Sequence, residues 1–182
     1  MRPRLLLIIA AMAAIAALAA WLLSSGGGGG EDRPDYPYDV QTFEDLGRDH
    51  LAPDQTYEMY NSEPPTTGPH SPAPAPWGVS DTTLAREVPV HNMEHGGVVI
   101  WYNCAAGDLD EAACRELRDG LADITVTKGA EGKQVLMLPY ADMDVLIALT
   151  AWSKLDTLDE LDAERVALFI DAFDRLFNPE NF

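Results

Sequence analysis

The chain has few cysteines and few basic residues, and each shortage excludes a class of protein. No cysteine lies near the N-terminus, so a lipoprotein anchor is excluded, and the spacing of Cys104 and Cys114 is not a redox C-x-x-C motif. The 12 basic residues are set against 30 acidic ones, a formal net charge of −18. A surface this acidic repels nucleic acid and anionic lipid headgroups and attracts cations, so nucleic acid is not an expected partner.

Long apolar runs are also scarce, and the one that exists stands at the N-terminus. Residues Leu5 to Leu23 are all apolar and follow Arg2 and Arg4. A helix of this length spans about 28 Å, roughly the hydrocarbon thickness of a bilayer. The positive flank predicts that the tail stays in the cytoplasm. A signal peptide cleaved near Ala17-Leu18-Ala19 is the alternative, although Trp21 continues the apolar run.

These features predict a signal anchor over residues 1–23, a glycine-rich flexible linker over 24–35 and a domain over 36–182 outside the cytoplasm, tethered to the cell membrane. In an oxidising compartment two cysteines in one domain are more often a disulfide than a ligand set. We therefore expect a disulfide between Cys104 and Cys114.

The hydrophobic pattern predicts an α+β domain with a mixed sheet and helices packed on it. Strands are expected over Gln55–Tyr60, Gly97–Asn103, Ile124–Lys128, Lys133–Pro139 and Val145–Ser153, with a hairpin turn over Gly129–Gly132. Helices are expected from Asp108 to about Asp123 and near the C-terminus, where Asp159 or Asp162 caps an apolar stripe from Val166 to Phe177. Apart from the first short strand, the order is β-α-β-β-β-α, loosely thioredoxin-like.

The stretch His91-Asn92-Met93-Glu94-His95-Gly96-Gly97 holds two of the four histidines. In an extended chain the Cα atoms of His91 and His95 would be about 13 Å apart, too far to bind one ion. On a helical turn they are about 6 Å apart and point the same way. A metal site therefore requires a turn here, and the glycine pair lets the chain leave it for the following strand.

The other two histidines and one methionine complete a candidate site. Six prolines between Pro64 and Pro76 predict a stiff surface arm that holds His70 in place. We predict a metal site of His70, His91 and His95, completed by Met143 or His50, with Glu94 orienting an imidazole from the second shell. Imidazole with thioether favours copper, whereas imidazole with carboxylate suits zinc as the alternative. A carrier or storage role fits better than catalysis, because no nucleophile–base arrangement is visible.

Two other functions are compatible with the same residues. In the first, the domain is a structural or protein-interaction module of the cell envelope, its histidines are buried hydrogen-bonding groups, and exposed aromatics such as Trp77 contact a partner. In the second, His91-x-x-Glu94-His95 is a zinc hydrolase motif with glutamate as the base. That chemistry needs a long helix, and no helix of useful length fits between Val88-Pro89-Val90 and the strand from Gly97.

Four stretches resemble a family of bacterial exported proteins known only as a domain of unknown function. They are Asn61–His70, Val90–Ile100, Pro139–Asp144 and Ile147–Trp152, and the likeness covers about Gly47 to Phe177. The resemblance implies a leading hydrophobic anchor and places His50, His70, His91, His95 and Met143 on positions of the family pattern. Leucine is common in the family where Met93 stands, which argues against Met93 as a ligand. No activity follows from the resemblance.

Overall fold

The computed structural model describes residues 34–179. The expected anchor over residues 1–23 and most of the linker over 24–35 lie outside these residues. Within the described part of the chain, no helix is both long and apolar enough to cross a bilayer.

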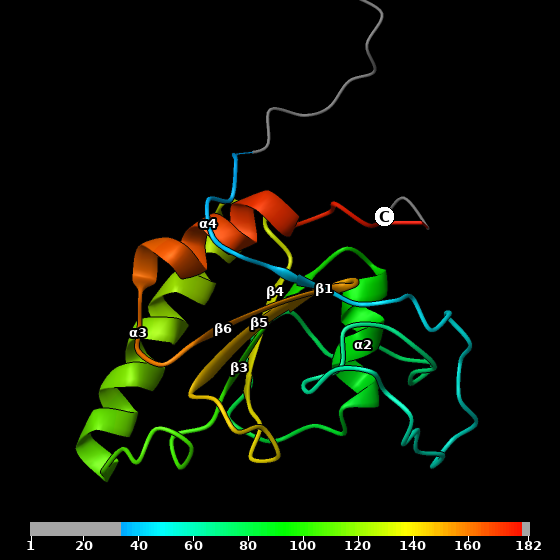
Figure 1. Cartoon of the computed structure of the whole chain (residues 1–182), viewed down its shortest axis with the longest axis horizontal. Coiled ribbons are helices and arrows are strands. Elements are labelled where there is room, and N and C mark those ends of the chain that lie inside the picture. The colour runs from blue at the N-terminus through cyan, green and yellow to red at the C-terminus, as the bar shows by residue number, and fades with distance from the viewer. Residues whose placement is uncertain (1–33, 180–182) are drawn as a thin grey trace, which may run out of the picture. The chain divides into compact units, whose positions relative to one another are not determined.

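A six-stranded mixed sheet forms the centre of the domain (Figure 1). Its strands are β1 (Gln41–Thr42), β2 (Gly78–Val79), β3 (Val98–Tyr102), β4 (Val135–Pro139), β5 (Ile147–Ala151) and β6 (Lys154–Leu158), in the spatial order β1-β6-β5-β3-β4-β2. β3 pairs parallel with β4 and antiparallel with β5. In the described residues the helices are α2 (Glu87–Glu94), α3 (Glu111–Ala130) and α4 (Ala163–Phe173). The predicted α+β class with a mixed sheet is confirmed, and the likeness to thioredoxin stays a prediction.

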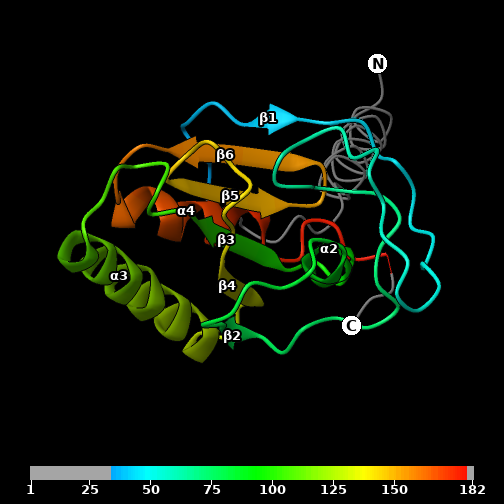
Figure 2. The same cartoon turned by 90° about the horizontal axis from the view of Figure 1, so that it is seen from below.

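Alternate residues of β3 face two different layers of the core. Val98 and Ile100 belong to a buried cluster with side chains of α3 and α4, whereas Val99 and Trp101 pack in a second cluster that includes Met93 of α2. Because both faces are covered, all five residues of β3 are buried and apolar. Figures 1 and 2 show α3 and α4 on one side, and α2 on the other together with the loops that precede it.

The predicted strand over Ile124–Lys128 is wrong, because these residues belong to α3. Leu117, Leu121 and Thr125 recur every four residues and form the buried face of that helix. The β-branched residues in this stretch favour a strand, but packing of this face overrides the local preference. The predicted hairpin turn over Gly129–Gly132 is instead the end of the helix, where Gly132 adopts a φ of +87°.

Two further predictions from pattern differ from the structure. Residues Gln55–Tyr60 do not join the sheet, and the amide of Tyr57 donates instead to the carboxylate of Glu87 (2.9 Å). Strand β6 was not predicted, because a buried Asp156 interrupts its apolar pattern. Both oxygens of Asp156 accept hydrogen bonds from Arg165, which compensates the burial of the charge. From β3 onward the order is β-α-β-β-β-α; it has the predicted sequence of letters only because β6 takes the place of the wrongly predicted strand over Ile124–Lys128.

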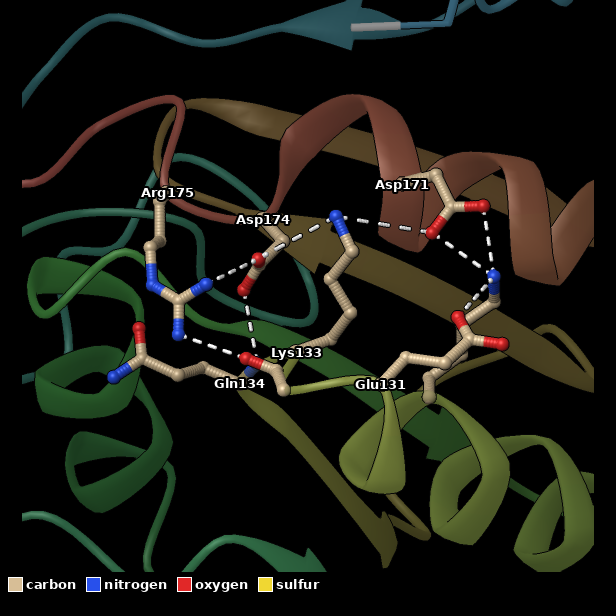
Figure 3. Close-up of polar contacts among 8 residues, drawn as sticks. Glu131, Lys133, Gln134, Asp171, Asp174 and Arg175 are labelled. Atoms are coloured by element: carbon tan, nitrogen blue, oxygen red, sulfur yellow. Dashed lines mark hydrogen bonds and ion pairs between the residues drawn. The ribbon is translucent and has the colours of Figure 1, made fainter. Parts of the chain in front are cut away.

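A polar cluster ties the ends of α3 and α4 to the start of β4 (Figure 3). Asp174, which is 3% exposed, accepts a hydrogen bond from the amide of Gln134 (2.9 Å) and pairs with Arg175 (3.1 Å). Lys128 of α3 donates to both carboxylate oxygens of Asp171 in α4 (2.9 and 2.8 Å). These contacts fix how the two helices lie on the sheet.

We predict that Asp174→Ala lowers the free energy of unfolding by about 1–3 kcal/mol, because it removes the acceptor of the Gln134 amide. Glu131→Ala is the matched control, since Glu131 is exposed and its loss should change stability by no more than about 0.5 kcal/mol. Urea unfolding measures both. Equal effects of the two substitutions would contradict this account of the cluster.

Candidate functional site

Three segments of the chain bring histidines together beside α2. One is the loop that contains His50, the second is the proline-rich arm at His70, and the third is α2 itself with His91. The first two segments are joined by backbone hydrogen bonds from Leu51 to the carbonyl of His70 (2.8 Å) and from His70 to the carbonyl of Asp49 (3.0 Å). The site is therefore built on paired backbone and a helix, although most of its residues come from loops.

The motif from His91 to Gly97 forms the helical turn that chelation requires. Helix α2 spans eight residues and ends at Glu94, with His95 as its C-cap. It includes Pro89, which the first turn of a helix tolerates because the amides there have no partner within the helix. A helix therefore does form where none of useful length was expected, but it stops at the motif.

The glycine pair after the motif is required by close contacts. Gly96 has a φ of +88°, and a Cβ atom there would lie 2.9 Å from the carbonyl oxygen of Phe177. A Cβ on Gly97 would lie 2.2 Å from the ring of Trp77. The chain can turn from α2 into β3 only with glycine at these positions.

Four side chains offer ligand atoms that lie within 4.8 Å of one another: His50, His70, His91 and Glu94. Nε2 of His70 is 3.0 Å and Nε2 of His50 is 3.7 Å from Oε2 of Glu94. The ring centroids of His70 and His91 are 5.0 Å apart, and His50 stacks on His91 at 5.1 Å. His70, His91 and Glu94 are buried.

Two backbone carbonyls determine which nitrogen of each buried histidine is available. Nδ1 of His70 lies 2.8 Å from the carbonyl oxygen of Gly68, and Nδ1 of His91 lies 2.7 Å from that of Ser71. A carbonyl oxygen can only accept, so both Nδ1 atoms carry the proton and donate it. The other nitrogen of each ring, Nε2, contacts Oε2 of Glu94 in His70 (3.0 Å) and Nε2 of His95 in His91 (2.7 Å). A histidine that donates through one nitrogen to a backbone carbonyl and presents the other is the arrangement found at metal sites.

Burial also keeps His91 in the form that can bind a metal. Desolvation lowers the pKa of His91, and the neighbouring rings of His70, His95 and His50 lower it further, against the hydrogen bond to Ser71 that raises it. His91 is therefore neutral at pH 7, as a ligand must be.

The remaining predicted residues occupy different surroundings. Nε2 of His95 lies 2.7 Å from Nε2 of His91 and, because His91 carries its proton on Nδ1, donates a hydrogen bond to it. Met143 is 2% exposed and packs in the same apolar cluster as Val90 and Met93, which favours a role in the core for both methionines.

Glu94 has a more central place than the sequence suggested. We expected its carboxylate to orient an imidazole without binding the ion, and the structure places this carboxylate among the candidate ligand atoms. The helical spacing was the available signal, since Glu94 follows His91 by three residues and shares its face of the turn.

The predicted disulfide between Cys104 and Cys114 is present, with Cα atoms 5.5 Å apart. It joins the chain just after β3 to the first turn of α3. The bridge stabilises a part of the fold that contains none of the four candidate ligands.

Comparison with known proteins gives one match. A family model described as a protein of unknown function (DUF3105) matches residues 50–181, which include all four candidate ligands. No curated protein and no solved structure matches the chain. The match agrees with the resemblance to a domain of unknown function that the sequence motifs suggested.

The lowered pKa of His91 predicts that metal-free protein loses stability as the pH falls below about 6.5, the pKa of an unperturbed histidine. Below that pH the unfolded chain binds a proton more readily than the folded one, so the free energy of unfolding decreases with a slope of up to about 1.4 kcal/mol per pH unit. His91→Gln, whose amide can still donate to Ser71, should have a flatter profile. Denaturant unfolding between about pH 5 and 7.5 measures the difference, and superimposable slopes would contradict the prediction.

Proposed function

We propose that this chain, which belongs to the DUF3105 family, binds a divalent metal ion. The ligands would be His50, His70, His91 and Glu94. One observation carries the proposal. The carbonyl oxygens of Gly68 and Ser71 accept the Nδ1 protons of two buried histidines, and Nε2 of His70 lies 3.0 Å from the buried carboxylate of Glu94. A cation among the four candidate ligands would compensate the charge of that carboxylate.

The donor set favours a divalent ion over Cu(I). Three imidazole nitrogens and a carboxylate oxygen suit zinc or Cu(II), whereas the case for Cu(I) depended on the thioether of Met143. That thioether packs among apolar side chains. Between the two divalent ions, Cu(II) binds more tightly to most sites of this composition.

We further propose that the domain works outside the cytoplasm, tethered to the cell membrane, as a carrier or storage protein. The apolar run of Leu5 to Leu23 and the disulfide both favour an exported domain. A carrier role is favoured over catalysis because Glu94 lies within the ligand set. A carboxylate that binds the ion is not free to act as the base of a zinc hydrolase.

A structural role for the histidines is the second candidate, and one observation favours it. His70 is completely buried, lies edge-on to the ring of Trp152 at 6.3 Å, and could form an ion pair with Glu94 as an imidazolium. Trp77, the proposed contact with a partner in this function, is 39% exposed, but its ring also packs against Gly97.

The first test is metal loading of the purified chain with Zn²⁺ or Cu²⁺. We expect about one ion per chain, and a free energy of unfolding that rises by about 2.7 kcal/mol at a free metal concentration of 100 times Kd. Cu²⁺ should also quench the fluorescence of Trp152, whose ring lies beside His70, and Trp152→Phe should lose that part of the quenching.

His91→Ala and Glu94→Gln should abolish both binding and the added stability. If the histidines are instead structural, the wild-type chain retains less than one equivalent of either ion, and His91→Ala lowers stability without added metal. Calorimetry and metal analysis on the same samples separate the two outcomes.

A further prediction concerns Met143. Met143→Leu should leave the metal stoichiometry and affinity unchanged and lower stability by less than about 1.5 kcal/mol, because leucine fills a similar volume in the core. Competition with a chromogenic chelator measures the affinity. A selective loss of Cu⁺ binding in this variant would make Met143 a ligand.

A further inference from the structure

One of the four candidate ligands is open to solvent. The side chain of His50 is 48% exposed, whereas those of His70 and Glu94 are 0% and 4% exposed. His91 is also buried, at 5%. A molecule that approaches a bound ion therefore meets His50 before the other three ligands.

His50 is also held less firmly than the two buried histidines. The rings of His70 and His91 are fixed by hydrogen bonds from Nδ1 to backbone carbonyls. Within residues 34–179 no hydrogen bond of comparable length holds a ring nitrogen of His50, whose contacts are the 3.7 Å approach to Glu94 and ring contacts with His70 and His91. Its ring can turn outward and leave no buried polar group without a partner.

Beside His70 the site is closed by aromatic packing. The ring of Trp152 lies beside His70, and it stacks on Phe177 with ring centroids 4.8 Å apart and planes 4° from parallel. The carboxylate of Asp45 accepts a hydrogen bond from the indole of Trp152 (3.1 Å) and holds it in place. Of the four candidate ligands, His50 is therefore the one that solvent reaches.

On the basis of the proposed metal site, we infer that the ion is handed to a partner by ligand exchange at His50. A nitrogen donor of the partner forms a bond to the ion as the bond to Nε2 of His50 breaks, while His70, His91 and Glu94 still hold the ion. Their bonds break in the following step, and the oxidation state of the metal does not change. An imidazole of the partner suits this exchange, because replacing one imidazole by another preserves the donor set throughout.

The charge of the chain indicates the kind of partner. With 30 acidic and 12 basic residues, the chain attracts basic molecules and repels acidic ones. Asp49, directly before His50, and Asp54 are exposed carboxylates in the same loop. The acceptor that fits this surface is a basic protein segment that presents exposed histidines.

The test measures zinc transfer from the full chain to two synthetic peptides by stopped-flow fluorescence. Both peptides carry the same pair of histidines, flanked in one by lysines and in the other by glutamates. We expect a transfer rate proportional to peptide concentration and roughly tenfold faster to the lysine peptide at low ionic strength, with the difference shrinking in salt. His50→Ala should transfer several-fold faster than wild type, because no imidazole has to leave. Met59→Ala, at a residue 73% exposed, is the control and should leave the rate unchanged.

The possible outcomes separate this inference from the metal site itself. If metal analysis finds no zinc on the wild-type chain before mixing, both proposals fail. If zinc is bound but is released at a rate independent of peptide concentration, the ion dissociates first and the inference of exchange at His50 is wrong. An unchanged rate in His50→Ala overturns the role of His50, and equal rates to the two peptides overturn the basic partner. If His50→Ala retains no zinc, His50 is required for binding, and the inference that it is the loosely held ligand at which exchange occurs is wrong.

Discussion

The orientation of the His70 ring depends on the hydrogen bond from its Nδ1 to the carbonyl of Gly68. That bond in turn depends on an unusual backbone conformation at Gly68. Gly68 has a φ of +121°, which side chains with a Cβ rarely adopt, and a Cβ there would lie 3.1 Å from the ring of Tyr60. The hydroxyl of Tyr60 donates to the carbonyl of Pro69 (2.7 Å) and fixes the next peptide. The conformation of the arm thus determines which nitrogen of His70 faces Glu94, before any ion is considered.

The arm in turn is attached to α2 by several polar contacts, and the side chain of Asn92 makes two of them. Asn92, which is completely buried, accepts a hydrogen bond from the amide of Ala75 and donates one to its carbonyl, both at 2.9 Å. Just after the helix, the carbonyl of Gly96 accepts a hydrogen bond from the amide of Arg175 (2.7 Å). The ligands of α2 and of the arm are therefore held against each other by polar contacts in a mostly apolar layer, which gives the precise placement that metal binding needs.

The sequence predicted the class of the fold and the turn at His91, because both depend on local periodicity and spacing. It failed where distant residues decide the structure. Thr125 lies in a helix because α3 buries one face against the sheet, and β6 was missed because the partner of Asp156 is Arg165, in a later helix. For the site, spacing brought His91 and Glu94 together, but the place of His50 follows from its backbone pairing with His70, which no local pattern encodes.

Three of the candidate ligands are buried and held by hydrogen bonds, whereas His50 is exposed and held less firmly. In the proposed site this difference would make the affinity for the ion depend on other residues than the rate of exchange. In the proposed site, His70, His91 and Glu94 are buried and already in position, so little conformational entropy would be lost when they bind an ion. His50 would gain a bond to the ion but lose the freedom of an exposed side chain, and its net contribution to affinity would be correspondingly smaller. Its contribution to the activation barrier for ion exchange would be larger, because each exchange would begin by replacing His50, the candidate ligand that solvent reaches. In the proposed carrier role, this arrangement would let the protein retain an ion in transit and still release it on contact with a suitable acceptor.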